Sequence, residues 1–537
     1  MSTECYPITI LPHVSPLYRG YLGMGDSPAD AAVRRWYGAE PFASKWMRAE
    51  QPGGDAAGLA DALARQNAAF GAGADALANV EKLRGGARAV VTGQQVGLFG
   101  GPLLTLLKAA TAVARAKDAT RTSGVEHVPV FWLATEDHDL AEVDQVSLLT
   151  KTTVETLRAG LKTKAAVEVG GIALGSEIDQ VLEQAGELLE FSPAWEMLKE
   201  CYTPEQTLGG AFARLMARLF APQGLVVMDA ASREFHALGA STLRYAIEHA
   251  EELQTALIAR SEELVQAGFH AQVLVAAGGS LLFLVDEATG ERMALRRTPE
   301  DGWKAGGRVY SSAELIAILE SAPERLSPNA LLRPVFQDTI LPTVAYIGGP
   351  SEIAYFAQSA VLYEAILGRV TPVLPRLSAT LLEPAIATVM AAHEVQLPDA
   401  MTTAAELALR LGARAMPIEE KRRLAAAGNA LDAALTAAME YMGGMDESLG
   451  RTAEVSGSKM RYQMNRLRRM AAAFELQKEA SLAKHAAAIT LNVFPDGHPQ
   501  ERLVAGVWFV ARHGEGVVER LVEAAANLCP GHVVIRL

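Results

Sequence analysis

The chain has 537 residues, of which 50% are hydrophobic and 21% charged, so it has enough apolar material for two or three packed units and is not a disordered protein. Its net charge of −13 repels phosphate backbones, and we expect no nucleic-acid partner. No stretch approaches the ~18 apolar residues of a membrane span, and the amino terminus lacks the basic and apolar regions of a secretory signal. We therefore expect a cytoplasmic protein with no membrane partner. Its three cysteines, Cys5, Cys201 and Cys529, are far apart in the sequence and are expected to be reduced thiols.

The first predicted elements form a βαβ unit. Residues 87–93 are a short apolar run that ends at a glycine and predicts a strand, and residues 128–135 predict a second one. The helix between them is expected to hold Pro102 in its first turn. Its apolar face would contain Leu103, Leu106, Leu107 and Ala110. A βαβ unit predicts a parallel sheet with right-handed crossovers.

The alternation of strands and helices continues to about residue 375. Residues 224–229, 339–347 and 371–375 predict strands, and residues 208–220 and 352–367 predict helices. Residues 271–297 contain the turn signals Gly278-Gly279 and Thr289-Gly290 and predict an antiparallel insertion. We therefore expect an α/β fold, with a Rossmann-like parallel-sheet core and insertions over residues 1–375.

The composition then becomes helical, and residues 376–490 predict an α-helical coiled-coil arm. Apolar residues recur at three- and four-residue steps, first from Leu424 to Leu449 and then at Met460, Met464, Leu467, Ala471 and Phe474. This pattern predicts two long helices in a hairpin, with the bend at Gly450 or around 456–458. Residues 491–537 contain strand-like segments at 505–511 and 532–537 and should return to the core.

The first candidate site is the glycine-rich segment 92–102 between the first strand and its helix. Backbone N–H groups of such a loop, together with the helix N-terminus, suit a phosphate or carboxylate. The segment matches neither the Walker A motif nor the dinucleotide-binding spacing. The alternative is that the glycines only permit a tight turn. The candidate binding residues are Thr92, Gly93, Gln94, Gln95, Gly97, Phe99, Gly100 and Lys108.

The second candidate site follows the second strand, at the sheet edge where open α/β sheets bind ligands. It contains Glu136, Asp137, His138 and Asp139. The carboxylates can orient the imidazole for acid/base or charge-stabilising work, which makes these four the candidate catalytic residues. They could also hold Mg²⁺ beside a nucleotide. The alternative is a helix cap with acidic residues in the first turn.

The third candidate site is another strand, glycine and helix junction. Its candidate binding residues are Gly348, Gly349, Pro350, Glu352, Tyr355 and Gln358. Here too, Ser351 and Glu352 could serve only as a helix cap. Polar residues before the same strand could line a pocket or act as caps, namely Asn329, Arg333, Gln337 and Asp338. The sequence contains no G-x-S-x-G elbow and no zinc-ligand spacing, so hydrolase and zinc chemistry are disfavoured.

Taken in order, these segments resemble the BshC family, the cysteine ligases of bacillithiol biosynthesis. The resemblance is carried by VTGQQVGLFGGPLLTLLKA, VPVFWLATEDHD, LPTVAYIGGPSEIAYFAQ, PVLPRLSATLLE and NVFPDGHPQER. It implies a Rossmann-like core and a coiled-coil domain that mediates a homodimer. It also implies a reaction in which L-cysteine is joined to the amino group of glucosaminyl-malate, with ATP as the expected activator and Mg²⁺ as its companion.

The resemblance also implies roles for the candidate residues. Backbone donors from Gly93 to Gly101 would hold phosphate or carboxylate, and His138 with Asp137 would stabilise developing charge. Glu352 and Gln358 would position the amine or the sugar hydroxyls. Two alternatives remain open: a nucleotide-binding scaffold or sensor whose coiled-coil arm recruits partners without ligase turnover, and an amide ligase or nucleotidyltransferase for another amino-sugar conjugate.

Overall fold

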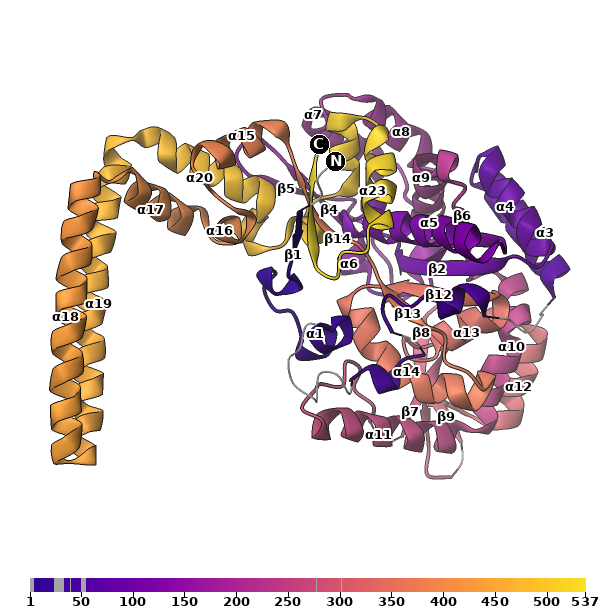
Figure 1. Ribbon diagram of the computed structural model, residues 1–537. Coiled ribbons are helices and arrows are strands. Elements are labelled where there is room, and N and C mark those ends of the chain that lie inside the picture. Colours follow the sequence, from indigo (N-terminus) through magenta and orange to yellow (C-terminus); the bar gives the residue numbers. More distant parts are fainter. Residues whose placement is uncertain (1–3, 24–32, 39, 50–54, 277, 301) are drawn as a thin grey trace.

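A five-stranded parallel sheet forms the centre of the molecule (Figure 1). The computed structural model describes residues 4–23, 33–38, 40–49, 55–276, 278–300 and 302–537. The strand order is β13-β12-β2-β3-β6, and every neighbouring pair is parallel. Their bounds are β2 (Arg88–Gln95), β3 (His127–Ala134), β6 (Val226–Asp229), β12 (Thr343–Gly348) and β13 (Val373–Pro375). The expected Rossmann-like core is confirmed.

Helices cover both faces of this sheet, which explains why its strands are nearly continuous apolar runs. Phe131 and Leu133 of β3 belong to the core formed with α5 (Leu104–Ser123) and α9 (Leu208–Leu219). Val130 and Trp132 point to the opposite core. That core includes residues of α3 (Ala56–Ala69), α4 (Ala74–Arg84), α10 (Arg233–Glu248), α13 (Arg333–Ile340) and α14 (Pro350–Leu367).

Helix α5 is buried on nearly all sides because the sheet lies on one side and α23 (Gly516–Ala526) packs on another. The predicted apolar face is confirmed, since Leu103, Leu106 and Leu107 are all buried. The predicted place of Pro102 is wrong. The helix begins at Leu104, and Pro102 instead forms a β-bridge with Ala505 of the chain's last segment.

The antiparallel insertion is confirmed and is larger than predicted. Its strand order is β10-β9-β8-β7-β11, with β7 (Gly279–Val285), β8 (Arg292–Arg297), β9 (Trp303–Ala305), β10 (Arg308–Tyr310) and β11 (Leu326–Pro328). Gly290, with φ of 71°, lies in the predicted turn between β7 and β8. The Gly278-Gly279 signal marks the start of β7 and not a turn between two strands. Similarly, the strand predicted from residue 339 begins at Thr343, because α13 continues to Ile340.

The remaining elements of the globular body surround these two sheets. A hairpin of β4 (Gln145–Leu149) and β5 (Val154–Arg158) follows the short α6 (Leu140–Val143). Further helices of the body include α1 (Pro16–Leu22), α7 (Glu177–Leu188), α8 (Pro193–Cys201), α11 (Ala250–Gln266) and α12 (Ser312–Ser321). No helix in the described ranges has the length and apolar character needed to cross a lipid bilayer.

A third sheet joins the two ends of the chain. Its order is β1-β15-β14, formed by β1 (Glu4–Tyr6), β15 (His532–Arg536) and β14 (Ser378–Leu382). Strand β14 lies where a helix was expected, because Ser378–Leu382 finds a parallel partner only in the distant β15. The prediction of three reduced thiols is also wrong. Cys5 and Cys529 form a disulfide across 524 residues, with Cα atoms 6.0 Å apart, and Cys201 alone is a free, buried thiol.

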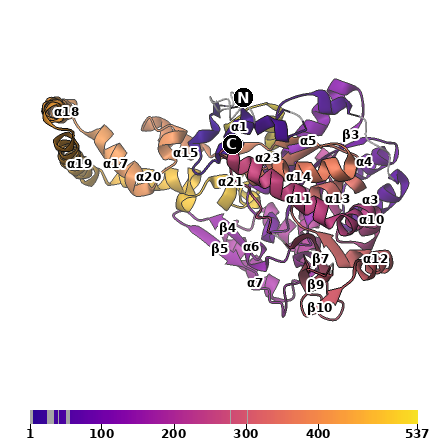
Figure 2. The same ribbon diagram turned by 90° about the horizontal axis from the view of Figure 1, so that it is seen from below.

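The helical arm projects from the globular body (Figures 1 and 2). Its base contains α15 (Pro384–Ala392), α16 (Leu397–Ala400), α17 (Ala404–Ala415) and α20 (Ala480–Val493). The predicted hairpin of two long helices is confirmed as α18 (Ile418–Met445) and α19 (Glu447–Lys478). The predicted bend is wrong, because Gly450 and residues 456–458 lie inside α19. The chain turns at Asp446, which has extended backbone and accepts hydrogen bonds from the N–H groups of Ser448 and Leu449.

The tail returns to the core as expected, but mostly as helices. After α21 (Gln500–Leu503), the segment predicted as a strand at 505–511 is instead α22 (Gly506–His513). Phe509 and Val510 join the core of α5 and α9, so tertiary packing overrides the β-propensity of this run. Only β15 keeps the predicted extended form.

Candidate active site

A cavity of about 670 Å³ opens at the carboxyl ends of β2, β3 and β12, beneath the antiparallel insertion. All three predicted segments contribute to its wall. The predicted residues that line it are Gly93, Gln94, Gln95, Lys108, Glu136, Asp137, His138, Gly349, Pro350, Glu352 and Tyr355, together with Asn329 and Arg333. The carboxyl edge of a parallel sheet brings these distant segments together.

Gly93 lies where β2 and β3 approach each other at this edge. A Cβ atom at Gly93 would lie 2.9 Å from the backbone oxygen of Trp132, closer than such atoms approach in proteins. A residue with a side chain would therefore force the two strands apart below the cavity. This gives Gly93 a steric role, independent of any hydrogen bond to a ligand.

The rest of the glycine-rich segment is buried below the cavity. The N–H of Gly97 donates to the Gln95 carbonyl at 3.0 Å, and the N–H of Gly100 donates to the Tyr202 hydroxyl at 3.2 Å. Phe99 is fully buried with φ of 51°. The N–H groups of Gly97 and Gly100 already have partners within the protein, which supports the alternative that these glycines serve the tight turn. Thr92 is also buried, and its hydroxyl donates to the Ile347 carbonyl at 2.9 Å, joining β2 to β12.

Several other predicted residues serve the scaffold. Gln358 is fully buried and holds the segment before β7, accepting from the Val273 N–H and donating to the Val273 carbonyl, both at 2.9 Å. Asp139 accepts a hydrogen bond from the Glu142 N–H at 3.3 Å and so caps α6. Gly348 ends β12 and is absent from the cavity wall, as are Gln337 and Asp338.

A cationic cluster, defined as Lys108, Arg333, Arg376 and Arg502, lines one part of the cavity. The Lys108 Nζ atom lies 2.6 Å from Glu352 Oε2 and 3.1 Å from Gln94 Oε1. Although burial favours the neutral acid, the Lys108 ammonium holds the pKa of Glu352 below its ordinary value. Glu352 also accepts from the Tyr346 hydroxyl at 2.6 Å and from the Gly349 N–H at 2.8 Å.

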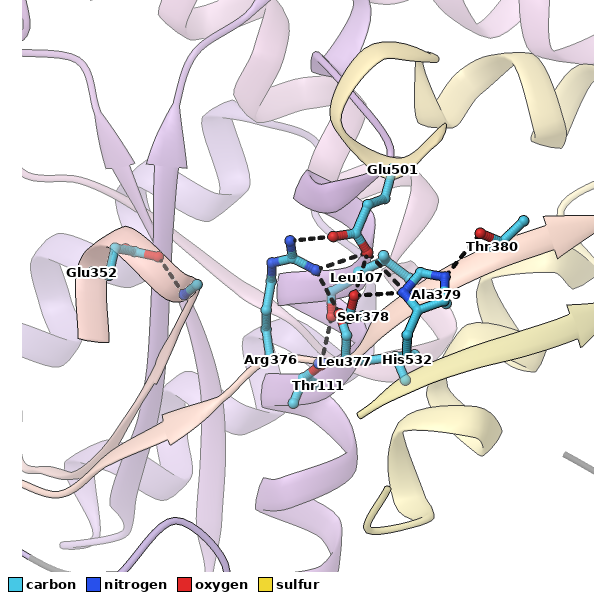
Figure 3. Close-up of polar contacts among 11 residues, drawn as sticks. Leu107, Thr111, Glu352, Arg376, Leu377, Ser378, Ala379, Thr380, Glu501 and His532 are labelled. Atoms are coloured by element: carbon cyan, nitrogen blue, oxygen red, sulfur yellow. Dashed lines mark hydrogen bonds and ion pairs between the residues drawn. The ribbon is translucent and has the colours of Figure 1, made fainter. Parts of the chain in front are cut away.

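The arginines of this cluster differ in how far their charges are compensated. Arg376 makes a two-pronged ion pair with Glu501 at 2.7 and 3.1 Å (Figure 3). Arg333 donates to the Tyr355 hydroxyl at 3.0 Å and to Gln337 Oε1 at 3.1 Å, which are both neutral groups. In the described part of the chain, no carboxylate forms an ion pair with Arg333 or Arg502. This side of the cavity therefore favours an anionic group.

An acidic cluster, defined as Glu136, Asp137 and Glu142, lines another part of the same wall. The Gln95 amide nitrogen lies 2.6 Å from Asp137 Oδ2 and 2.9 Å from Glu142 Oε2. Asp137 Oδ1 accepts from the His138 N–H at 2.7 Å. Arg292 lies beside this cluster, with one guanidinium nitrogen 3.3 Å from His138 Nδ1. Gln94 and Gln95 are adjacent at the end of β2. Gln94 contacts the cationic cluster through Lys108, and Gln95 contacts the acidic cluster.

Buried groups support the acidic cluster from behind. His236, fully buried on α10, has Nε2 2.8 Å from Glu136 Oε1. Burial alone would lower the pKa of His236, but its pairing with Glu136 raises it overall. Burial and the Glu136 charge raise the pKa of Glu168 to about 8, so Glu168 carries a proton at neutral pH. Within the residues described, no three His, Cys, Asp or Glu side chains converge as a metal-binding group.

The sequence reasoning missed Arg292, Arg376, Arg502 and His236. They come from the insertion, from the residue after β13, from α21 and from α10. The nearest signal was for Arg376 and Arg502, which lie within the segments PVLPRLSATLLE and NVFPDGHPQER that carry the family resemblance. Nothing local to Arg292 or His236 distinguishes them from ordinary surface or core residues.

Comparison with known proteins assigns the chain to a family. Residues 1–377 match the family model "Bacillithiol biosynthesis BshC, N-terminal Rossmann-like domain", and residues 379–537 match the corresponding C-terminal coiled-coil domain. A relative from Koribacter versatilis, named "Putative cysteine ligase BshC", is 40% identical over 542 residues, covering 100% of both chains. Relatives with the same name from Solibacter usitatus and Geobacillus kaustophilus are 36% and 30% identical, covering 84% and 87% of this chain and 84% and 88% of their own. The chain belongs to the BshC family of bacillithiol biosynthesis.

Proposed function

We propose that this protein is a ligase that joins L-cysteine to the amino group of glucosaminyl-malate, forming the amide bond of bacillithiol. The observation that carries the proposal is that a cationic cluster and an acidic cluster share one cavity, on the two sides of the β2 end. An amide ligase must bind an activated, anionic acyl group and an amine together, and these clusters offer opposite charges for the two partners.

ATP is the proposed activator. The cysteine carboxylate oxygen attacks a phosphorus atom of ATP and displaces diphosphate or ADP, giving a mixed anhydride. The sugar amine then attacks the carbonyl carbon, the carbon–oxygen bond breaks, and AMP or phosphate leaves with the bonding electrons. The amine loses one proton in this step. Mg²⁺ would enter the cavity bound to the phosphate oxygens of ATP, because this ion prefers oxygen ligands.

The cavity residues take the following roles in this scheme. The cationic cluster holds the phosphate or carboxylate and stabilises charge as it develops. His138, whose backbone N–H is held by Asp137 and whose ring contacts Arg292, acts on the acyl group or the departing proton. Glu136, Asp137 and Glu142 attract the substrate amine, while Glu352 keeps Lys108 in place.

The test is mass spectrometry of a reaction that contains the purified protein, ATP, Mg²⁺, L-cysteine and glucosaminyl-malate. We expect a protein-dependent bacillithiol mass that disappears when ATP is omitted. A second amino acid in place of cysteine, and glucosamine without malate, serve as substrate controls. If product forms equally well from another amino acid or another amino-sugar conjugate, the substrate assignment is wrong. If nucleotide binds but no product forms, the protein is a nucleotide-binding scaffold.

We further propose that the arm makes a homodimer. Met460, Leu467 and Phe474 recur at seven-residue spacing along α19, and their exposed fractions are 51%, 54% and 58%. They were expected to face α18, but the residues of α19 that are buried are the small Ala453, Gly457 and Ala472. The larger stripe is therefore free to pack against the arm of a second copy.

A further inference from the structure

The short helix α21 connects the base of the arm to the cavity. It follows α20 by a few residues and consists of Gln500, Glu501, Arg502 and Leu503. Gln500 and Glu501 are buried, with exposed fractions of 0% and 1%, although both are polar. Arg502 is the residue of this helix that lines the cavity.

Gln500 fixes one end of α21 with three hydrogen bonds. Its side-chain oxygen accepts from the Leu381 N–H at 2.8 Å, and its amide nitrogen donates to the Leu381 carbonyl at 2.9 Å. The same nitrogen donates to the Asn492 carbonyl at 2.6 Å, near the end of α20. The helix is therefore tied to β14 and to the last turn of the arm's base.

Glu501 fixes the other side and reaches four groups of the core (Figure 3). Its carboxylate accepts four hydrogen bonds: two from guanidinium nitrogens of Arg376, one from the Ser378 hydroxyl at 3.1 Å and one from the Ala379 N–H at 2.9 Å. The pair with Arg376 has 2% of each side chain exposed. Burial raises the pKa of a carboxyl group, but Arg376 and these donors lower the pKa of Glu501 to about 2. Glu501 is thus an anion at every physiological pH.

His532 supports this network from β15. Its Nδ1 atom lies 2.8 Å from the Ser378 hydroxyl and its Nε2 atom 2.8 Å from the Thr380 hydroxyl. Parallel pairing of β14 with β15 holds Ser378, Thr380 and His532 in register. The position of α21 is therefore determined by residues of the first sheet, the terminal sheet and the arm together.

Arg502 differs from its neighbours because the described residues provide no hydrogen-bond acceptor for its guanidinium group. Glu501, next to it in sequence, is already occupied by Arg376. Desolvation and the nearby Arg376 charge lower the pKa of Arg502, although the Glu501 carboxylate acts in the opposite direction. Arg502 is an exposed cation at the cavity wall without a protein partner, and it stands on a rigidly held helix, so it is suited to bind an oxyanion.

We propose that Arg502 is an anion-binding residue that the C-terminal domain supplies to the active site, and that Glu501 is the positioning residue that holds it and Arg376 in place. This inference rests on the proposed ligase function. The ligand is a substrate oxyanion, either a carboxylate of glucosaminyl-malate or a phosphate of ATP. In both cases the site is complete only when α21 is seated against β14.

The experiment measures calorimetric binding of ATP with Mg²⁺ and, separately, of glucosaminyl-malate to the full-length protein. We expect Arg502→Gln to weaken one of the two affinities by about 10- to 100-fold, as the loss of charge-assisted hydrogen bonds does. The ligand that is affected identifies the source of the oxyanion. Arg502→Lys should recover part of the loss. Arg512→Gln is the matched control, because Arg512 is an exposed arginine of the same segment whose partner is Glu383.

Glu501→Gln tests the positioning role. Glutamine keeps the size of the side chain but leaves Arg376 uncompensated, so binding of the same ligand should weaken in protein whose circular dichroism spectrum is unchanged. If Glu501→Gln only lowers the melting temperature and leaves both dissociation constants unchanged, it has no positioning role. If Arg502→Gln binds both ligands as the wild type does, the inference is wrong, and it is equally wrong if the wild type binds neither. Absence of product from a wild type that binds both would instead contradict the proposed function alone.

Discussion

At the scale of single residues, the cavity is built from charges that are mostly compensated in pairs. Lys108 with Glu352 and Arg376 with Glu501 are buried ion pairs, and Glu136 has His236 behind it. Such pairs contribute little net stability, but removal of one partner leaves an uncompensated buried charge that costs about 3–5 kcal/mol. Arg333 and Arg502 form no ion pair with a described carboxylate, so they are well placed to meet an anionic ligand.

His138 is the first residue to test by substitution. Its side chain is 41% exposed, so His138→Asn should leave the melting temperature unchanged. We expect product formation to fall by about 10²-fold or more, as when an acid/base or charge-stabilising group is removed. The measurement is the initial rate of bacillithiol formation by mass spectrometry. Unchanged turnover would remove His138 from the catalytic residues.

His532 should make stability depend on pH. Burial lowers its pKa from 6.5 to about 4, so the unfolded chain takes up this proton at a higher pH than the folded chain. The contribution is fully present above about pH 6.5, is lost as the pH falls from 6.5 to 4, and amounts to about 3 kcal/mol. Melting temperatures measured at several pH values should fall more steeply in this window for the wild type than for His532→Asn. Parallel curves would contradict the assignment.

At the scale of elements, the arm is a two-helix hairpin whose inner contact is made by small residues. Gly428 and Gly457 are buried, with the side chains of Arg468 and Met439 next to them. Close approach of the two helices leaves larger apolar side chains on the outside. The hairpin therefore presents an exposed apolar surface for contact with another chain, and none of its residues lines the cavity.

The double variant Leu467→Gln with Phe474→Gln tests this surface. If the stripe is a dimer contact, loss of two apolar side chains should weaken self-association by several kcal/mol. Sedimentation velocity at several protein concentrations should show a dimer for the wild type and a monomer for the variant. Arg466→Gln, on the same helix, is the control. A wild type that remains monomeric at high concentration would show that the hairpin satisfies its own packing.

At the scale of the whole molecule, the two termini close the structure. The disulfide between Cys5 and Cys529 adds to the pairing of β1 with β15, and β15 in turn positions β14 beside the Arg376 and Glu501 pair. Cys201 is not part of the disulfide. Burial raises the pKa of its thiol to about 11, so it stays protonated at neutral pH. The cross-link therefore acts at the edge of the sheet that supports α21.

Reduction of this disulfide should destabilise the protein. A cross-link that closes a long loop contributes about 2–4 kcal/mol, chiefly by restricting the unfolded chain. We expect a reducing agent to lower the melting temperature of the wild type, and Cys5→Ser to melt at that lower temperature with or without the reducing agent. Differential scanning calorimetry measures both. If the wild type melts at the same temperature in both conditions, the disulfide does not contribute.

Features that depend on local pattern could be predicted from the amino-acid sequence alone. Apolar runs predicted β2, β3 and β12, and the rule that parallel strands share one ligand-binding edge correctly brought Gln94, Asp137 and Glu352 to one cavity. Heptad spacing predicted the helical arm in the same way. The local pattern of apolar residues is enough to identify each element, but it did not decide which side of α19 is buried, since Met460, Leu467 and Phe474 are exposed.

Only the tertiary structure decided how these groups are used. The N–H groups of Gly97 and Gly100 were expected to bind a ligand but are taken by Gln95 and Tyr202, and residues 506–513 form a helix because the core requires one there. Arg502 reaches the cavity, and Cys5 reaches Cys529, only because the last segment folds back over the first sheet. Hydrogen-bond competition and contacts across hundreds of residues have no local signature, so the sequence pattern could not reveal them.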